Sequence, residues 1–307
     1  MKKSILILTD LSDNAQHVAE AALLLAGPLQ NNLILLNCDE LITTVAYYPI
    51  VPVMFDTQTW HEDRERSLNL LSEYLQHKFH NLYPHTEGLI IKSIIKEGDL
   101  LTSVKDVLKK HPINFIVMGA KSGSSTEHFL FGSETKTIAD HVPVPIVFIP
   151  ENMTGRPIRH ITFATNFLTQ DIDAIASLLV LRRNLGAILE IVHIRQYGQS
   201  DQLKNEKVWK AIDESCKDNP SLVLYHEVYG KEVTSRLQHF ASEHDTDLMV
   251  LSHEHHSYLY RTFREGIVQK SLYDQKIPLL VIPKLNPESH FFGFTSTKPS
   301  LMASKLT

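Results

Sequence analysis

The sequence is poor in cysteine, which excludes a disulfide framework. Only 2 of its 307 residues are cysteines, Cys38 and Cys216, and each lies in or beside an apolar pattern. Two such thiols are expected to stay reduced. The composition therefore predicts a protein of a reducing compartment, and we expect it in the cytoplasm.

Long apolar runs and an excess of basic charge are also missing. The apolar run near the N-terminus ends at Asp10 after six residues, too short for a signal peptide, and no stretch approaches the length of a membrane span. The 30 basic and 35 acidic side chains leave a net charge of -5. Bulk electrostatics would therefore not hold this protein on a nucleic acid or a membrane surface, and we expect neither partner.

Common catalytic motifs are absent as well. There is no Gly-x-Ser-x-Gly turn, no paired-cysteine motif and no Walker loop. Cys38 lacks a neighbouring base and is better explained as a core thiol, while Glu127 and Glu134 are more typical of solvated helix starts than of ATPase bases. We therefore expect no catalytic residue, and a weak ATPase is the only enzymatic alternative.

What the sequence does contain is an alternation of short apolar strands and helical patterns. In the first half, strands are predicted at 4–9, 33–38, 88–95, 115–119 and 145–149. Helices are predicted after Ser12, over 57–79, from Gly98 and Asp99 onward, and over 133–141. Continuous apolar strands separated by helices indicate a parallel sheet that is covered on both faces.

The second half repeats this order. Its strands are predicted at 160–165, 189–194, 222–228, 248–252 and 279–282. Asp10 and Asn166 lie 156 residues apart, as do Cys38 and Ile194, whereas Gly119 and Ser252 lie 133 apart. The pattern predicts an α/β protein of two tandem, open, five-stranded parallel sheets, with domains at 1–152 and 153–285 and a flexible tail at 286–307.

Two strand ends of the first half carry candidate ligand-binding residues. Thr9 and Asp10 follow the first strand, and a glycine- and serine-rich loop from Gly119 to Ser133 follows the fourth. Ligands of open parallel sheets collect at the carboxyl ends of the strands, and a helix start such as Gly132-Ser133 offers free amides to an anion. From spacing alone, a phosphate site and a flexible crossover are equally good explanations.

In these residues the sequence resembles the universal stress protein family in its tandem form. That family has Gly, two residues, Gly, nine residues, then Gly and Ser or Thr, together with an Asp after its first strand. The chain has Gly119, Ser122, nine further residues, Gly132 and Ser133, with Asp10 in TDLSDNA, and VPVPIVFIP looks like the closing strand. The resemblance covers residues 1 to about 285 and implies Rossmann-like domains of the adenine-nucleotide alpha hydrolase-like kind.

The resemblance also implies a ligand, ATP or AMP, with Mg²⁺ as a candidate companion. Ser122 stands where the family has its second glycine, and Glu134 stands where a small or apolar residue is usual. Thr9, Asp10 and the backbone near Cys38 would hold the adenine end. The full nucleotide-binding set is Thr9, Asp10, Cys38, Met118, Gly119, Lys121, Ser122, Gly123, Gly132, Ser133, Glu134 and Thr135.

The second half has lost this pattern. Ser252 and His255 replace the two glycines, Glu265-Gly266 replaces Gly-Ser, and Asn166 replaces the strand-end Asp. We expect this half to be structural or to bind something else. The run His253–His256 is too closely spaced to converge on one ion, so no metal site is expected, although these side chains could fill the vacated pocket.

Two functions of different class follow. The first is a stress-response regulatory protein that binds an adenine nucleotide in its first domain, with the second domain completing a pseudo-dimer. The resemblance implies that the strands at 145–149 and 279–282 pair, as the last strands of family members commonly do. Each of these strands would otherwise leave an apolar sheet edge open, and a homodimer could form in the same way. The second is a nucleotide-free interaction module or a carrier of an apolar ligand.

Overall fold

The computed structural model describes residues 2–39, 57–120, 133–151, 153, 155–195, 205–252, 277–283 and 291–292. By their contacts, the residues divide into two compact units, Met1–Gly119 and Ala120–Thr307. The predicted domains at 1–152 and 153–285 follow the sequence repeat and stay predictions. None of the described helices combines the length and apolar character of a membrane span.

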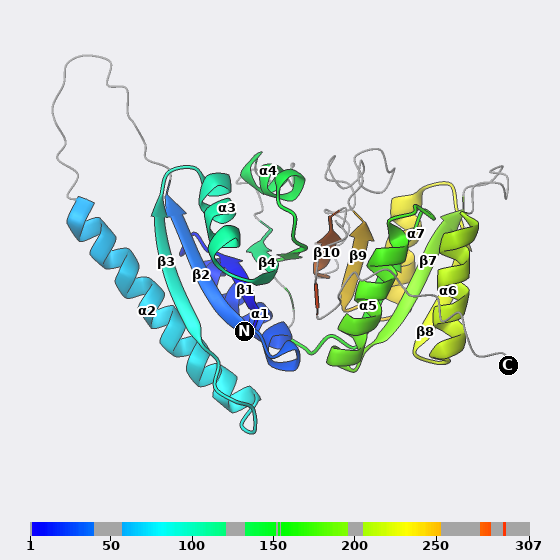
Figure 1. The fold of residues 1–307 in the computed structure, drawn as a ribbon, viewed down its shortest axis with the longest axis horizontal. Coiled ribbons are helices and arrows are strands. Elements are labelled where there is room, and N and C mark those ends of the chain that lie inside the picture. Colours follow the sequence, from blue (N-terminus) through cyan, green and yellow to red (C-terminus); the bar gives the residue numbers. More distant parts are fainter. Residues whose placement is uncertain are drawn as a thin grey trace, which may run out of the picture. The chain divides into compact units, whose positions relative to one another are not determined.

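The first unit is a four-stranded parallel sheet covered by helices (Figure 1). Its strand order is β3-β2-β1-β4. The strands are β1 (Ser4–Leu8), β2 (Asn32–Asp39), β3 (Ile91–Glu97) and β4 (Ile113–Gly119). The helices are α1 (Asp13–Leu29), α2 (Thr57–Leu82) and α3 (Leu100–Lys110). Neighbouring residues of β2 show that α2 and α3 lie on opposite faces, because Asn37 bonds to α2 and Cys38 bonds to α3.

Burial explains why these residues form these elements. Every residue of β1 is buried, as the continuous apolar run predicts for a strand that is covered on both faces. On α1, Val18, Ala22 and Leu25 form one buried apolar face. Helix α3 starts where predicted, because the Asp99 carboxylate accepts a hydrogen bond from the Thr102 backbone N–H at 2.7 Å and so caps the helix.

The second unit contains six strands in the order β5-β10-β9-β6-β7-β8. They are β5 (Ile146–Ile149), β6 (His160–Ala164), β7 (Ile188–Arg195), β8 (Val223–Tyr229), β9 (Leu248–Ser252) and β10 (Leu279–Ile282). The helices are α4 (Ser133–His141), α5 (Asp171–Leu185), α6 (Glu206–Asp218) and α7 (Val233–Glu243). Strands β5 and β10 pair antiparallel, with Leu279 opposite Phe148, which confirms the predicted pairing of these two edges.

The α/β fold and all ten predicted strands are confirmed. By their contacts the strands divide four and six between the two units, where the prediction was five and five, and the other differences are local. Strand β3 begins at Ile91 instead of residue 88. Of the predicted flexible tail, the structure describes only Phe291 and Phe292. Both are buried, and the Asn184 amide donates to the Phe292 carbonyl at 3.4 Å.

Candidate functional site

The carboxyl end of β1 is a tight turn that presents Thr9 and Asp10. The Thr9 hydroxyl oxygen accepts from the Leu11 backbone N–H, and the Asp10 carboxylate accepts from the Ser12 N–H, each at 3.1 Å. Leu11 adopts the left-handed conformation, with φ of 59°. Thr9 is buried and Asp10 is exposed, so the turn holds a carboxylate at the surface of this sheet edge.

Gly119 ends β4 beside this turn. Leu8 is paired with Met118, so Thr9 and Gly119 continue the two strands at one level. A Cβ atom on Gly119 would lie 3.1 Å from Cγ2 of Val18 and 3.6 Å from Nδ2 of Asn14. The glycine therefore allows the first turns of α1 to pack closely on the strand end, whether or not a ligand also approaches it.

A polar link that the sequence analysis missed joins α2 to the same sheet edge. The buried Asn37 amide donates to the Thr9 carbonyl at 2.8 Å, and its Oδ1 accepts from the Arg64 guanidinium. This link places a cationic group of α2 next to the ends of β1 and β2. The available signal was an amide inside the apolar run LILLNC.

The Cys38 side chain faces away from this link. Its thiol lies 3.3 Å from both the Gly98 carbonyl and the Ser103 hydroxyl, at the start of α3. The thiol therefore helps to fix α3, which agrees with its interpretation as a core thiol. The predicted contact of the nearby backbone with a nucleotide stays a prediction.

The other predicted site residues are distributed over both units. Met118 is buried in β4 of the first unit, while Ser133, Glu134 and Thr135 begin α4 of the second. Lys121, Ser122, Gly123 and Gly132 lie outside the described residues, as do Glu127, His253–His256 and Glu265-Gly266. Within the first unit, the structure thus brings together Thr9, Asp10, Met118 and Gly119.

The turn after β6 repeats the threonine hydrogen bond and the left-handed residue of the turn after β1. The Phe167 N–H bonds to the Thr165 hydroxyl at 3.0 Å, and Phe167 has φ of 58°, as Leu11 does in the first unit. His193 takes the place of Asn37, with its Nδ1 at 2.9 Å from the Thr165 carbonyl oxygen. The repeat read from residue spacing therefore extends to the local structure.

The second unit differs in what lies between the strand ends. Asp171, the first residue of α5, accepts from the Ser252 hydroxyl at 2.8 Å, from the Thr165 hydroxyl at 2.7 Å and from the Leu168 N–H at 3.1 Å. Asp171 and Ser252 correspond to Ala15 and Gly119 of the first unit. A buried network of hydrogen bonds thus joins β6, α5 and β9 where the first half has only an alanine and a glycine.

Aromatic side chains fill the neighbouring space of the second unit. The Phe167 ring lies 4.8 Å from the ring of His193, and the Trp209 ring lies 4.9 Å from that of Tyr225. Burial and the nearby Glu227 carboxylate raise the pKa of Tyr225 far above its ordinary value, so its hydroxyl stays protonated. The corresponding positions of the first unit carry Leu11, Asn37 and Ser93.

Residues 1–150 match the model of the universal stress protein family. No curated protein sequence matches the chain significantly. The family match covers the strand-end turn, Gly119 and the whole glycine- and serine-rich loop, so the resemblance seen in these motifs is confirmed for the first half.

Solved structures share the fold over nearly the whole chain. A universal stress protein from Archaeoglobus fulgidus DSM 4304 is 17% identical, with a TM-score of 0.66, over 93% of this chain and 97% of its own. A putative universal stress protein from Pseudomonas aeruginosa UCBPP-PA14 is 14% identical, with a TM-score of 0.59, over 92% and 93%. The cytoplasmic domain of a prokaryotic cation chloride cotransporter is 11% identical, with a TM-score of 0.54, over 92% and 95%. These likenesses show the fold alone, which serves more than one kind of protein.

Proposed function

We propose that the first half of the chain binds an adenine nucleotide, ATP or AMP, and that the protein is a regulatory member of the universal stress protein family. The observation that carries this proposal is the inequality of the two repeats. Both halves build the same strand-end turn, around Thr9 in one and Thr165 in the other. Only the second has a buried carboxylate bonded across its strand ends, among the described residues.

Side-chain size supports the assignment of the nucleotide to the first half. Ala15 and Gly119 stand where the second half has Asp171 and Ser252. A ligand at the carboxyl ends of β1 and β4 would therefore not compete with a side-chain network at these two positions. Open parallel sheets bind ligands at this edge, where the direction of the connections reverses.

Charge supports roles for two residues. Asp10 is exposed at the strand end, and its carboxylate can accept hydrogen bonds from an adenine amino group or a ribose hydroxyl. Arg64 is held by Asn37 at the same edge and supplies positive charge near a nucleotide. The predicted phosphate contacts of Gly132 and Ser133, and any Mg²⁺, belong to this proposal.

The second half has a different role in the proposal. Its strand-end space is occupied by Asp171, Ser252 and an aromatic group around Phe167. These contacts stabilise the second unit without a ligand. They therefore favour a structural role for the second half, as the partner of the first. The antiparallel pair of β5 and β10 supplies the edge pairing that a pseudo-dimer needs.

Calorimetric titration of the full chain with ATP, ADP and AMP, with and without Mg²⁺, tests the proposal. We expect Asp10→Ala to weaken binding about 10- to 100-fold, the effect of losing hydrogen bonds to a charged group. Asn166→Ala, the same position in the second repeat, is the matched control and should leave the affinity unchanged. Circular dichroism checks that both variants fold.

Two results would contradict this proposal. Absence of heat with all three nucleotides would favour the nucleotide-free interaction module. A loss of binding in Asn166→Ala, with Asp10→Ala unchanged, would place the site in the second half instead.

A further inference from the structure

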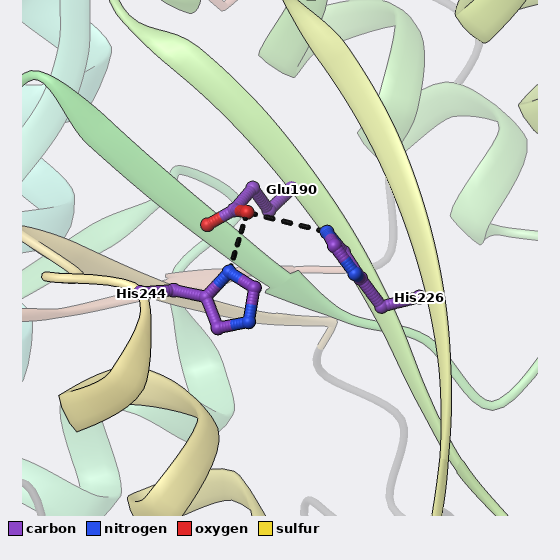
Figure 2. Close-up of side chains that lie close together, drawn as sticks. All are labelled: Glu190, His226 and His244. Carbon is purple, nitrogen blue, oxygen red and sulfur yellow. Dashed lines mark hydrogen bonds and ion pairs between the residues drawn. The ribbon is translucent and has the colours of Figure 1, made fainter.

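Three side chains from different elements of the second unit converge on one point, away from the strand-end turns. They are Glu190 of β7, His226 of β8 and His244, which ends α7 (Figure 2). Nδ1 of His244 lies 2.7 Å from Oε1 of Glu190, and Nε2 of His226 lies 3.2 Å from the same oxygen. One donor atom from each residue lies within 4.8 Å of the other two.

The sheet register and the end of α7 produce this arrangement. Glu190 is paired with Leu224, so His226, two residues further on, points to the same face of the sheet. Helix α7 packs on β7, and the ring of its last-turn Phe240 stacks on His244 at 3.9 Å and lies 5.1 Å from His226. The two imidazole rings are therefore held in place by a common aromatic neighbour.

The fold itself does not require these polar residues. In the first repeat, Ile34 occupies the place of Glu190 and Ile94 the place of His226, while His111 ends α3 as His244 ends α7. Isoleucine satisfies the sheet at these positions with no charge to bury. A buried ionised side chain is costly unless it is fully paired, so its presence in the second repeat needs another explanation.

The pairing of Glu190 within the protein is incomplete. The residue is 4% exposed, and its Oε2 atom has no hydrogen-bond partner among the described residues. Nε2 of His226 is within ion-pair distance of the carboxylate but does not form a well-directed hydrogen bond with it. A cation between these atoms would satisfy both groups at once.

The donor set suits a transition metal. Two imidazole nitrogens and one carboxylate oxygen form a set that binds Zn²⁺ at about 2.0–2.2 Å, with a fourth position open. Ligand atoms at such distances lie roughly 3.3 Å apart in a tetrahedron, so modest side-chain rotations would close the present separations around an ion. The side chains of His226 and His244 are 28% and 30% exposed, which leaves an approach for the ion and a water molecule.

The geometry points to a divalent metal site in the second unit, with Glu190, His226 and His244 as ligands and Zn²⁺ as the ion that fits their chemistry best. No metal site was expected from the sequence, in which only His253–His256 stood out as a cluster of histidines. The bound ion would join the end of α7 to β7 and β8. It would therefore stabilise the second unit independently of any nucleotide in the first.

The test uses the full chain, stripped of metal with a chelator and titrated with Zn²⁺ against a competing chromophoric chelator. We expect one strongly bound Zn²⁺ per chain, with affinity falling at least about 10-fold in His226→Gln and in His244→Gln. His239→Gln is the matched control, because His239 is an exposed histidine of the same helix. Co²⁺ should give the visible absorption of tetrahedral coordination in the wild type and in the control only.

Thermal unfolding gives a second measurement. Zn²⁺ should raise the melting temperature of the wild type and of His239→Gln, but not that of His226→Gln. His226→Gln keeps the hydrogen bond between His244 and Glu190, so its metal-free form is expected to fold. Equal Zn²⁺ affinity in all variants, or no strong binding in the wild type, would overturn the site and leave an ion pair without a metal.

Discussion

The hydrogen bond between Ser252 and Asp171 should measurably stabilise the second unit. Ser252→Ala removes the hydroxyl that donates to Oδ1 of Asp171 at 2.8 Å. Asp171 is 1% exposed and Ser252 is 8% exposed, so water cannot readily replace the lost donor. The other carboxylate oxygen keeps its bonds from Thr165 and Leu168, which confines the damage to one oxygen atom.

The magnitude follows from the charge of the acceptor. A hydrogen bond to a charged group contributes about 1.5–3 kcal/mol net, against about 1 kcal/mol for a neutral pair. We therefore expect Ser252→Ala to lower the free energy of unfolding by about 2 kcal/mol. For a unit of this size, such a change lowers the melting temperature by about 4–8 °C.

Urea unfolding of a double-mutant cycle measures the bond itself. The cycle consists of the wild type, Ser252→Ala, Asp171→Ala and the double variant, and we expect a coupling energy of about 1.5–3 kcal/mol. Ser177→Ala is the matched control, because this buried serine donates to the Asp173 backbone carbonyl, a neutral acceptor, and its loss should cost about 1 kcal/mol. A coupling energy below about 0.5 kcal/mol would refute the reasoning.

Two further predictions concern charge and core packing. Burial raises the pKa of Asp171 above its ordinary value of 3.8, outweighing the opposing hydrogen bonds. The folded state therefore binds the proton more tightly than the unfolded state does. This contribution to stability is complete below pH 3.8 and is lost as the pH rises through the raised pKa. The unfolding free energy of the wild type, relative to that of Asp171→Asn, should therefore increase as the pH falls toward 3.8. If urea unfolding gave a difference in free energy between the two proteins that stayed constant or decreased as the pH fell, the prediction would be wrong. On α2, Leu68→Ala should cost about 2–5 kcal/mol, because Leu68 is fully buried, whereas Leu70→Ala, at 61% exposure, should cost less than about 0.5 kcal/mol in the same assay.

The elements of the fold were predictable because their signals are local. Each predicted apolar run corresponds to a strand, and some of these strands, such as SILIL of β1 and LMVLS of β9, are buried along their whole length. Turn and cap residues, such as Asp99, mark where helices start. The pairing of β5 with β10 was expected from the family resemblance together with two apolar edges that would otherwise stay open.

The candidate sites were predictable only in part. Thr9, Asp10 and Gly119 lie at strand ends, where sequence position alone implies proximity. Asp171 was not predicted as a site residue, because the repeat aligns Asn166 with Asp10. The carboxylate of the second half comes instead from the start of α5. The hydrogen bonds of Asn37 were not predicted, because a single amide in an apolar run does not indicate which residues it will contact.

The sequence by itself determined the order of elements, the repeat, the family resemblance of the first half and the loss of glycines in the second. These properties depend on residues that are near one another in the chain or that recur at a regular spacing. Only the tertiary structure decided that Asp171 meets Ser252 and that Glu190 meets His226 and His244. Glu190 and His244 are 54 residues apart, and their contact depends on strand register and on where α7 ends, which no local pattern encodes.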